Sequence, residues 1–289
     1  MVAVVLLSLL AATVFGTSVA LQSYEAGTTD SRSSLRPSLL IDLAQRPLWL
    51  IGLVGDIGGF ALQTAALALG SLLIVQPILT LGLVAALMVS ARLTKRRLTG
   101  WEWRAVGGVV VGLIVFYLAA QPTPHSEGVA SAAAWATAAA IVGAILMISL
   151  SVGRRRDLTA RAVLFGLAAG CAEAVMAVIS KAFGDRLGDG VWHTFTSWEP
   201  YVLIVWGIVT LIIVQSAYQL DRSTVTLPVI TVAEPVIAMT VGLALFRERP
   251  QLGVASIVLA VAGLGWTLRS LVVLARDPAL SPTVGDGHR

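Results

Sequence analysis

Three acidic side chains lie near the middle of long apolar stretches: Asp56, Glu173 and Glu234. A carboxylate in the hydrocarbon of a bilayer costs at least ~2.5 kcal/mol, unless it faces a partner or a water-filled cavity. Burial favours the neutral form, so such groups can carry protons or bind cations. Three acids at similar depth predict one shared polar site for substrate or coupling. The alternative is that each acid is permanently neutral and bonds a neighbouring helix.

Amides and a phenol accompany these acids. Gln215 and Gln219 are four residues apart and share a helix face, and Tyr218 lies three residues from Gln215. These groups can hydrogen-bond a polar substrate, or join helices at roughly 0.6 kcal/mol each. The candidate polar residues are Gln22, Gln63, Gln76, Gln215, Tyr218 and Gln219.

Prolines interrupt two of the apolar stretches. Pro77 lies in one, while Pro228 and Pro235 share another, in which Pro235 directly follows Glu234. Proline removes a backbone donor, and the freed carbonyl must find another partner. A broken helix beside a carboxylate is a common way to build a transport site, so these positions predict helix breaks at the site. A kinked packing helix is the simpler alternative.

The composition predicts a bundle of membrane-spanning helices. Of the 289 residues, 57% are hydrophobic and only 12% are charged. A hydrocarbon core of roughly 30 Å needs about 20 apolar helical residues. Nine stretches meet this need approximately, and we expect an all-α polytopic membrane protein with about nine spans. They are residues 2–24, 47–69, 71–93, 101–120, 129–152, 161–183, 198–220, 223–246 and 251–274.

Several functional classes have no support in the sequence. The single cysteine, Cys171, excludes a disulfide framework and a cysteine zinc cluster. The motifs GxxxxGK[ST], HExxH and GxSxG are absent. We therefore expect neither an enzyme nor a bound cofactor. The arginines occupy short loops between apolar stretches, which argues against a nucleic-acid partner.

Loop charges predict the orientation in the cell membrane. Basic residues are concentrated on the cytoplasmic side of membrane proteins. Nine spans place 16 of the 20 basic residues on one side and Lys181, Arg186, Arg247 and Arg249 on the other. The N-terminus is therefore expected outside and the C-terminus in the cytoplasm. The 16 residues are Arg32, Arg36, Arg46, Arg92, Lys95, Arg96, Arg97, Arg104, Arg154, Arg155, Arg156, Arg161, Arg222, Arg269, Arg276 and Arg289.

An internal repeat is visible without gaps. A shift of 151 residues superposes Pro77 on Pro228 and Gly112 on Gly263, and it also matches Ala66 with Ala217, Leu69 with Leu220 and Met88 with Met239. One central helix separates the halves, so the second half enters the membrane inverted, as in many secondary transporters. We expect one domain over residues 1–276, comprising repeat one (9–121), a linking helix (129–152) and repeat two (160–273). Residues 277–289 are expected to form a disordered tail.

Small residues and one lysine complete the expectations for packing. Gly55 and Gly59, Gly108 and Gly112, and Gly166 and Gly170 are small-xxx-small pairs, which let helix backbones approach closely. Lys181 lies near the outer end of its helix, where we expect its amine to extend towards the membrane surface.

Two segments resemble the drug/metabolite transporter superfamily. They are GDIGGFALQTAALALGSLLIVQPILTLGLVAALMVSARL and AYQLDRSTVTLPVITVAEPVIAMTVGLALFRERPQLGVASIVLAVAGLGW. The nine-helix layout is similar to that of the NIPA-type magnesium transporters. Gly55-Asp56 and Phe60 match the glycine–carboxylate pair and aromatic residue of that group, whereas Gly59 replaces its asparagine. The resemblance implies a transporter fold with the site between the halves.

Three transport functions remain open from the sequence, besides a non-transporting membrane scaffold, which would leave the three acids without a role. The first is a secondary transporter that moves a small metabolite or amphiphile by alternating access, coupled to protons through Asp56, Glu173 or Glu234. The second is a magnesium or divalent-cation transporter that uses the same acids as ligands. The third is a flippase for a lipid-linked sugar. The expected partners are the bilayer and one of these substrates, and a homodimer is left open.

Overall fold

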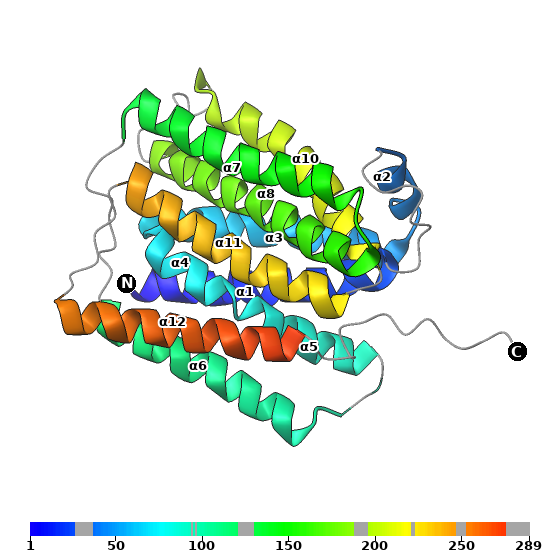
Figure 1. Cartoon of the computed structure of the whole chain (residues 1–289), viewed down its shortest axis with the longest axis horizontal. Coiled ribbons are helices and arrows are strands. Elements are labelled where there is room, and N and C mark those ends of the chain that lie inside the picture. The colour runs from blue at the N-terminus through cyan, green and yellow to red at the C-terminus, as the bar shows by residue number, and fades with distance from the viewer. Residues whose placement is uncertain are drawn as a thin grey trace, which may run out of the picture.

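The computed structural model describes residues 1–26, 37–93, 95, 97–120, 130–187, 196–220, 223–246 and 253–275. All regular secondary structure in these residues is α-helical, and the helices are arranged as a bundle (Figure 1). The helices are α1 (Val2–Ala26), α2 (Pro37–Leu43), α3 (Pro47–Leu69), α4 (Leu72–Leu79), α5 (Gly82–Leu93), α6 (Gly100–Ala120), α7 (Ala132–Gly153), α8 (Leu158–Leu187), α10 (Glu199–Tyr218), α11 (Ser223–Leu245) and α12 (Val254–Ala275).

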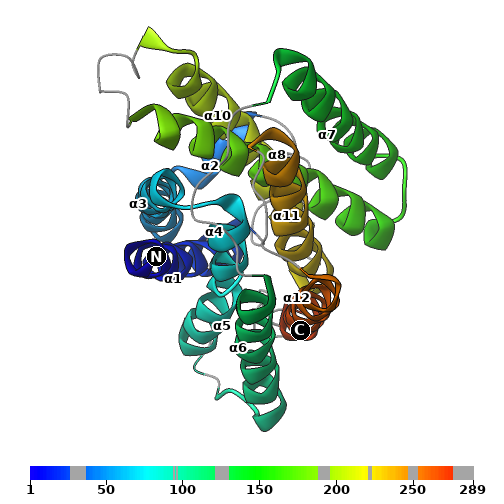
Figure 2. The ribbon, with the colours of Figure 1, turned by 90° about the vertical axis from the view of Figure 1, so that its left-hand side faces the viewer.

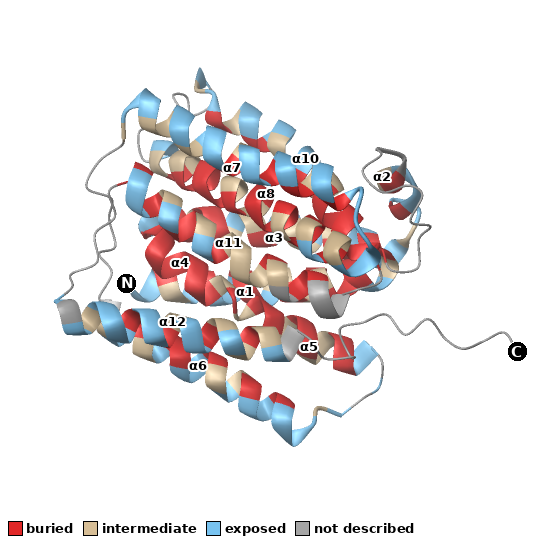
Figure 3. Cartoon of the chain, in the orientation of Figure 1, coloured by how far each residue is buried: buried red, intermediate tan, exposed pale blue. Residues whose placement is uncertain are grey.

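The chain is a multi-pass membrane protein. Eight helical segments of the described chain are long and apolar enough to cross a membrane, with α4 and α5 counted together as Leu72–Leu93. The remaining predicted span, 223–246 (α11), has a shorter described apolar stretch, Val229–Leu245. Large apolar side chains such as Met147, Ile204 and Val258 are exposed on the outer helices. Figure 3 shows the exposed faces of these helices in pale blue. So much exposed apolar surface suits contact with lipid.

The predicted break at Pro77 is present. The third apolar stretch forms α4 and α5, which are separated by Thr80 and Leu81. The Thr80 hydroxyl donates to the Pro77 carbonyl (2.6 Å), and the Leu81 N–H donates to the Ile78 carbonyl (3.0 Å). These bonds between residues three apart form a tight turn, which satisfies carbonyls left without intrahelical donors where α4 ends.

The predicted breaks at Pro228 and Pro235 are absent. Helix α11 is continuous from Ser223 to Leu245. A Cβ added at Gly170 of α8 would lie only 3.1 Å from the Glu234 backbone nitrogen. Such close packing on α8 supports α11 along its length, so loss of two backbone donors does not end the helix.

Two groups of helices surround the centre of the bundle. The first comprises α1, α3, α4 and α5, and the second comprises α8, α10 and α11. Helix α1 packs mainly on α3 and α5, and α8 packs mainly on α10 and α11. Helices α6 and α12 pack against each other and lie beside α5, away from α7 and α10 (Figure 2). The main contacts between the two groups are those of α3 with α8 and of α4 with α11.

All three small-xxx-small pairs lie at close helix contacts. Gly166 and Gly170 face α11, where an added Cβ would meet the Thr226 carbonyl oxygen (3.0 Å) and the Ala233 Cβ (2.7 Å) respectively. Gly59 of α3 faces the Phe15 ring of α1. Gly55 contacts Ser18 of α1, and Gly108 and Gly112 contact α12. The sequence interpretation of these glycines as packing residues is therefore confirmed.

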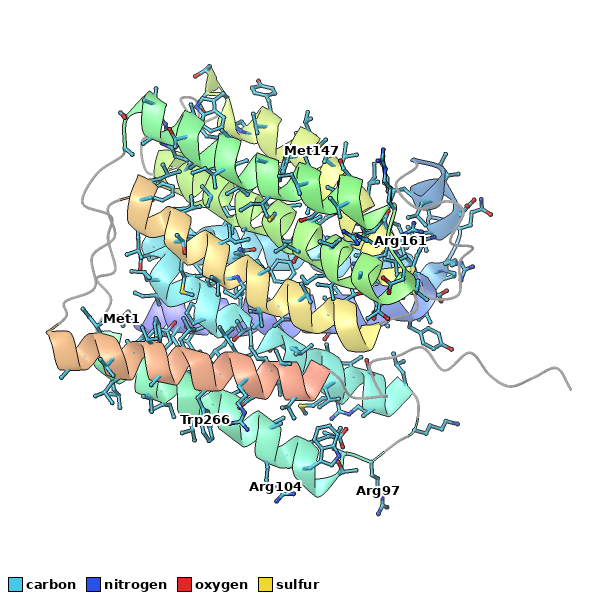
Figure 4. The ribbon with its side chains drawn as sticks, in the orientation of Figure 1. Met1, Arg97, Arg104, Met147, Arg161 and Trp266 are labelled. Carbon is cyan, nitrogen blue, oxygen red and sulfur yellow. The ribbon has the colours of Figure 1, made fainter. Side chains whose placement is uncertain are left out.

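The bundle has two chemically different ends. Arg97, Arg104 and Arg161 lie towards one end, which we call the basic end, and Met1 marks the opposite one, the Met1 end (Figure 4). The short helix α2, which the apolar pattern does not predict, lies at the basic end (Figure 1) and buries Leu39 and Leu43. The predicted tail, residues 277–289, lies outside the described residues.

Candidate functional site

The three predicted acids come from three different helices and meet inside the bundle. Asp56 lies on α3, Glu173 on α8 and Glu234 on α11. The Glu173 and Glu234 carboxyl groups lie within hydrogen-bonding reach of each other, and Asp56 lies within electrostatic reach of Glu173. Two carboxyl groups can form a hydrogen bond only when one of them carries a proton. The pair is therefore a candidate carrier of a shared proton between α8 and α11.

Close packing of α8 on α11 explains this pair. Gly170 stands about one helical turn before Glu173, and it lets the α11 backbone approach at Glu234. Because an alanine at position 170 would crowd Ala233 and the Glu234 nitrogen, glycine permits the short distance between the two carboxyl groups.

Asp56 begins a chain of side-chain hydrogen bonds that crosses between helices. The Gln22 amide of α1 donates to Asp56 Oδ2 (2.5 Å), and the Gln215 amide of α10 donates to Gln22 Oε1. Ser18, one turn before Gln22 on α1, lies beside the Asp56 carboxyl, and its hydroxyl donates to the Val14 carbonyl (3.0 Å). Asp56 on α3 is thus tied to α1 and, through Gln22, to α10.

Aromatic side chains of α10 border the acids. Tyr218 is buried and lies within electrostatic reach of Asp56, Glu173 and Glu234. The indole Nε1 of Trp206 donates to the Ala172 carbonyl (3.0 Å), next to Glu173. One wall of the site thus consists of an aromatic ring and a phenol.

The acids are more accessible than the amides around them. Asp56, Glu173 and Glu234 are half-buried, whereas Gln22 and Gln215 are buried. Polar groups buried in a protein are nearly always hydrogen-bonded, yet Gln215 Oε1 has no partner within the described residues. The centre of the bundle therefore holds three half-buried carboxyl groups and, beside them, one buried acceptor oxygen that has no partner among the described residues.

Within the described residues, the Gln63 and Gln76 side chains have no hydrogen bond to this cluster. Gln63 is buried on α3, two turns beyond Asp56, and Gln219 is buried at the end of α10. Gln76 is buried on α4, and neither of its side-chain polar atoms has a hydrogen-bond partner in the described part of the chain. Their predicted contact with a substrate stays a prediction.

The prediction for Lys181 is wrong. Its side chain does not extend to the surface: it is only 3% exposed, and its Nζ donates to the Leu67 carbonyl of α3 (2.9 Å) and to Asp185 Oδ1 (2.7 Å). A carbonyl at a helix end and an acid four residues away compensate the buried charge, so the amine does not need the interface.

Ligand chemistry bears on the cation alternative. Across the described residues, no group of three or more histidine, cysteine or acidic side chains is arranged to hold a metal ion. Glu173 lies within electrostatic reach of both Asp56 and Glu234, and their role as cation ligands stays a prediction.

An apolar groove lies apart from the acids. It has a volume of about 610 Å³ and is lined by α1, α4 and α6, including Val5, Ile78 and Ile114. Tyr117 also lines it, and its hydroxyl donates to the Ile74 carbonyl of α4. The site acids do not line this groove, whose lining suits a hydrocarbon chain.

Two residues of the site escaped the sequence interpretation. Ser18 carries a signal, because it lies four residues before Gln22 and so shares its face of α1. Trp206 carries none, because an isolated tryptophan in an apolar helix is indistinguishable from a packing or lipid-facing residue.

Comparison with known proteins gives one informative result. The chain is 30% identical over 246 residues to a protein of Corynebacterium glutamicum that is described as uncharacterized, and the match covers 81% of this chain and 84% of that protein. No family model matches the sequence. No solved structure matches it.

Proposed function

We propose that this chain, which belongs to the same family as the uncharacterized Corynebacterium glutamicum protein, is a secondary active transporter of the drug/metabolite type. It moves a small metabolite or amphiphile by alternating access. Transport is coupled to protons through Asp56, Glu173 and Glu234.

The observation that carries this proposal is the carboxyl pair. The Glu173 and Glu234 carboxyl groups approach within hydrogen-bonding reach in the middle of two apolar helices, and both side chains are half-buried. Ionisable groups inside a membrane are costly and usually mark proton relays or substrate paths. A pair that holds one proton and has access to water can release that proton when a substrate binds or the bundle changes shape.

Helix boundaries support an inverted repeat, with α7 as the linking helix. Adding 151 to the ends of α3 (47 and 69) gives 198–220, against 199–218 for α10. The same shift takes α4 and α5 (72 and 93) to 223–244, against 223–245 for α11. The main packing partners also correspond, since α1 packs on α3 and α5 as α8 packs on α10 and α11.

The contact between α6 and α12 supports an axis in the membrane plane. A Cβ at Gly112 would lie 2.7 Å from the Gly263 carbonyl oxygen, and a Cβ at Gly263 would lie 2.8 Å from the Gly112 carbonyl oxygen. These two glycines are 151 residues apart, and such a reciprocal contact is expected on a two-fold axis. Gly108 contacts Ser270, so the two helices are antiparallel. Equivalent helices run antiparallel when an in-plane axis relates them.

Nine spans and the concentration of arginines at the basic end predict a cytoplasmic C-terminus and an outside N-terminus. A C-terminal alkaline phosphatase fusion, which is active only outside the cytoplasm, should be inactive in cells, and a C-terminal green fluorescent protein should be fluorescent. The same two reporters fused after Ala120 should give the reverse result, because an even number of spans precedes that point. An active C-terminal phosphatase would contradict both the orientation and the number of spans.

The apolar groove favours a second candidate, a flippase for a lipid-linked sugar. Its volume of about 610 Å³ and its lining of aliphatic side chains fit a lipid tail. The acids and amides would then contact the sugar. Among the described residues no arrangement comparably favours a divalent cation.

Proteoliposomes that contain a pH-sensitive dye test the proposal. Amino acids, Mg²⁺ and polyprenyl-phosphate sugars should each be added to protein-containing and empty vesicles under a pH gradient. We expect at least one organic compound to raise proton flux in vesicles with the wild-type chain, and to raise its thermal midpoint in detergent. A response to Mg²⁺ alone would favour the cation alternative, and a response to the lipid-linked sugar alone would favour the flippase.

A further inference from the structure

Lys181 is a buried charge that the proposed proton-coupling site does not use. It lies on α8, eight residues beyond Glu173, which places it about 12 Å farther along the helix. That direction leads to the Met1 end, because Gly70, just after α3, contacts Val4 of α1, and the end of α8 packs on the end of α3. Lys181 therefore lies between the acids and the Met1 end.

The two partners of Lys181 belong to different parts of the bundle. Asp185 is on the same helix, one turn farther along, and its side chain is 34% exposed. Leu67 is on α3, two residues before that helix ends. The last carbonyls of a helix lack intrahelical donors, and a cation there is favoured by the helix dipole. The bond from Lys181 to Leu67 thus joins α8 to the end of α3.

The surface around this bond is closely packed. A Cβ added at Gly184 of α8 would lie 3.1 Å from the Thr64 carbonyl oxygen and from the Ala68 nitrogen of α3. Ala66 and Leu67 of α3 belong to one buried cluster with Val178 of α8. Helices α3 and α8 therefore close the Met1 end of the bundle beside the acids.

A different polar bond joins the helices at the basic end. There α1 and α10 are linked by the uncharged Gln22–Gln215 pair, and they pack less extensively than α3 and α8. In the proposed repeat, α1 corresponds to α8 and α3 to α10, so these are equivalent interfaces at opposite ends. One interface is held by a lysine and the other by an amide.

We propose that Lys181 is a positioning residue for transport, the latch that closes the Met1 end of the path to the acids. Its bond to Leu67 must break when α3 and α8 separate, whereas its ion pair with Asp185 moves with α8. The lysine charge therefore stays compensated when the path opens. Only one charge-assisted hydrogen bond, from Lys181 to Leu67, differs between the closed and the open state, so both states remain accessible. This inference rests on the proposed transport function.

Labelling of an introduced cysteine tests the latch. Val178 is 5% exposed and lies between Glu173 and Lys181, so Val178→Cys in a Cys171→Ala background reports opening beside the acids. A membrane-impermeant maleimide is added to intact cells, where it reaches the Met1 end, or to inverted vesicles, where it reaches the basic end. Lys181→Met keeps the length of the side chain and removes its charge, and Lys181→Arg restores the charge.

We expect Lys181→Met to accelerate labelling of Val178→Cys from one side of the membrane only. Loss of a hydrogen bond to a charged group shifts an equilibrium about tenfold or more. Lys181→Met should therefore raise the labelling rate of Val178→Cys about tenfold from the Met1 end, with no rise from the basic end, and Lys181→Arg should return it towards the wild-type rate. An unchanged rate, or an equal rise from both ends, would overturn the latch.

The native cysteine separates opening from unfolding. Cys171 is fully buried on α8, so it should stay unlabelled in Lys181→Met without the reporter substitution. Labelling of Cys171 would mean that the lysine only stabilises the fold, and would overturn the proposal. The assay needs neither substrate nor pH gradient. If labelling rises from one side only but the chain shows no proton-coupled flux, the role of Lys181 is supported and the proposed function is contradicted. If labelling rises from both sides in a chain that transports, the proposed function is supported and the role of Lys181 is contradicted.

Discussion

Glu234→Gln and Glu173→Gln should each abolish proton-coupled flux in proteoliposomes while leaving the protein folded. Glutamine keeps the size of the side chain, and its amide can donate to the remaining carboxyl group, so the contact between α8 and α11 survives. Each change should cost about 0.5–1.5 kcal/mol of stability at most. The titratable proton is lost, and flux should fall to the level of empty vesicles.

The measurement combines dye-reported proton flux with the infrared stretch of the protonated carboxyl. That stretch should be present in the wild type and reduced in both variants. Glu25→Gln is the matched control, because Glu25 pairs with Arg46 (3.0 Å) at the end of α1 and lies outside the site. It should leave flux unchanged. If flux and its pH dependence persist in Glu234→Gln, the carboxyl pair is only structural and the coupling proposal fails.

Helix positions could be predicted from the sequence because apolar length is a strong signal. The predicted stretch 223–246 matches α11, and 198–220 matches α10 to within two residues. The depth of Glu173 and Glu234 follows from their places in the predicted stretches 161–183 and 223–246. Their close approach does not, because the way a helix faces depends on packing, here on Gly170 against α11.

Long-range polar contacts could not be predicted from the sequence. Gln22 and Gln215 are 193 residues apart, and nothing in either segment indicates the other. For Lys181 the general preference for the membrane surface gave the wrong answer, because the end of α3 offers it a carbonyl in the interior. The prolines of α11 show a similar limit: close packing on α8 keeps a helix continuous where local propensity predicts a break.

Gly112→Leu and Gly263→Leu should separate α6 from α12 and lose most of the folded protein. An added Cβ at Gly112 would lie 2.8 Å from the Thr267 nitrogen, and one at Gly263 would lie 2.7 Å from the Phe116 nitrogen. These are backbone atoms, which cannot rotate away, so the helices themselves must move. Overpacking of this kind costs about 3 kcal/mol or more.

Two neighbouring glycines provide matched controls. A Cβ at Gly107 of α6 or at Gly265 of α12 would meet nothing within 4 Å. Gly107→Leu and Gly265→Leu add the same side chain to the same helices, so they should change stability by only about 0.5 kcal/mol. Size-exclusion profiles and thermal midpoints in detergent should separate the two pairs. Equal behaviour of all four variants would show that α6 and α12 are not held at this crossing, and would remove the reciprocal glycine contact as support for the two-fold axis.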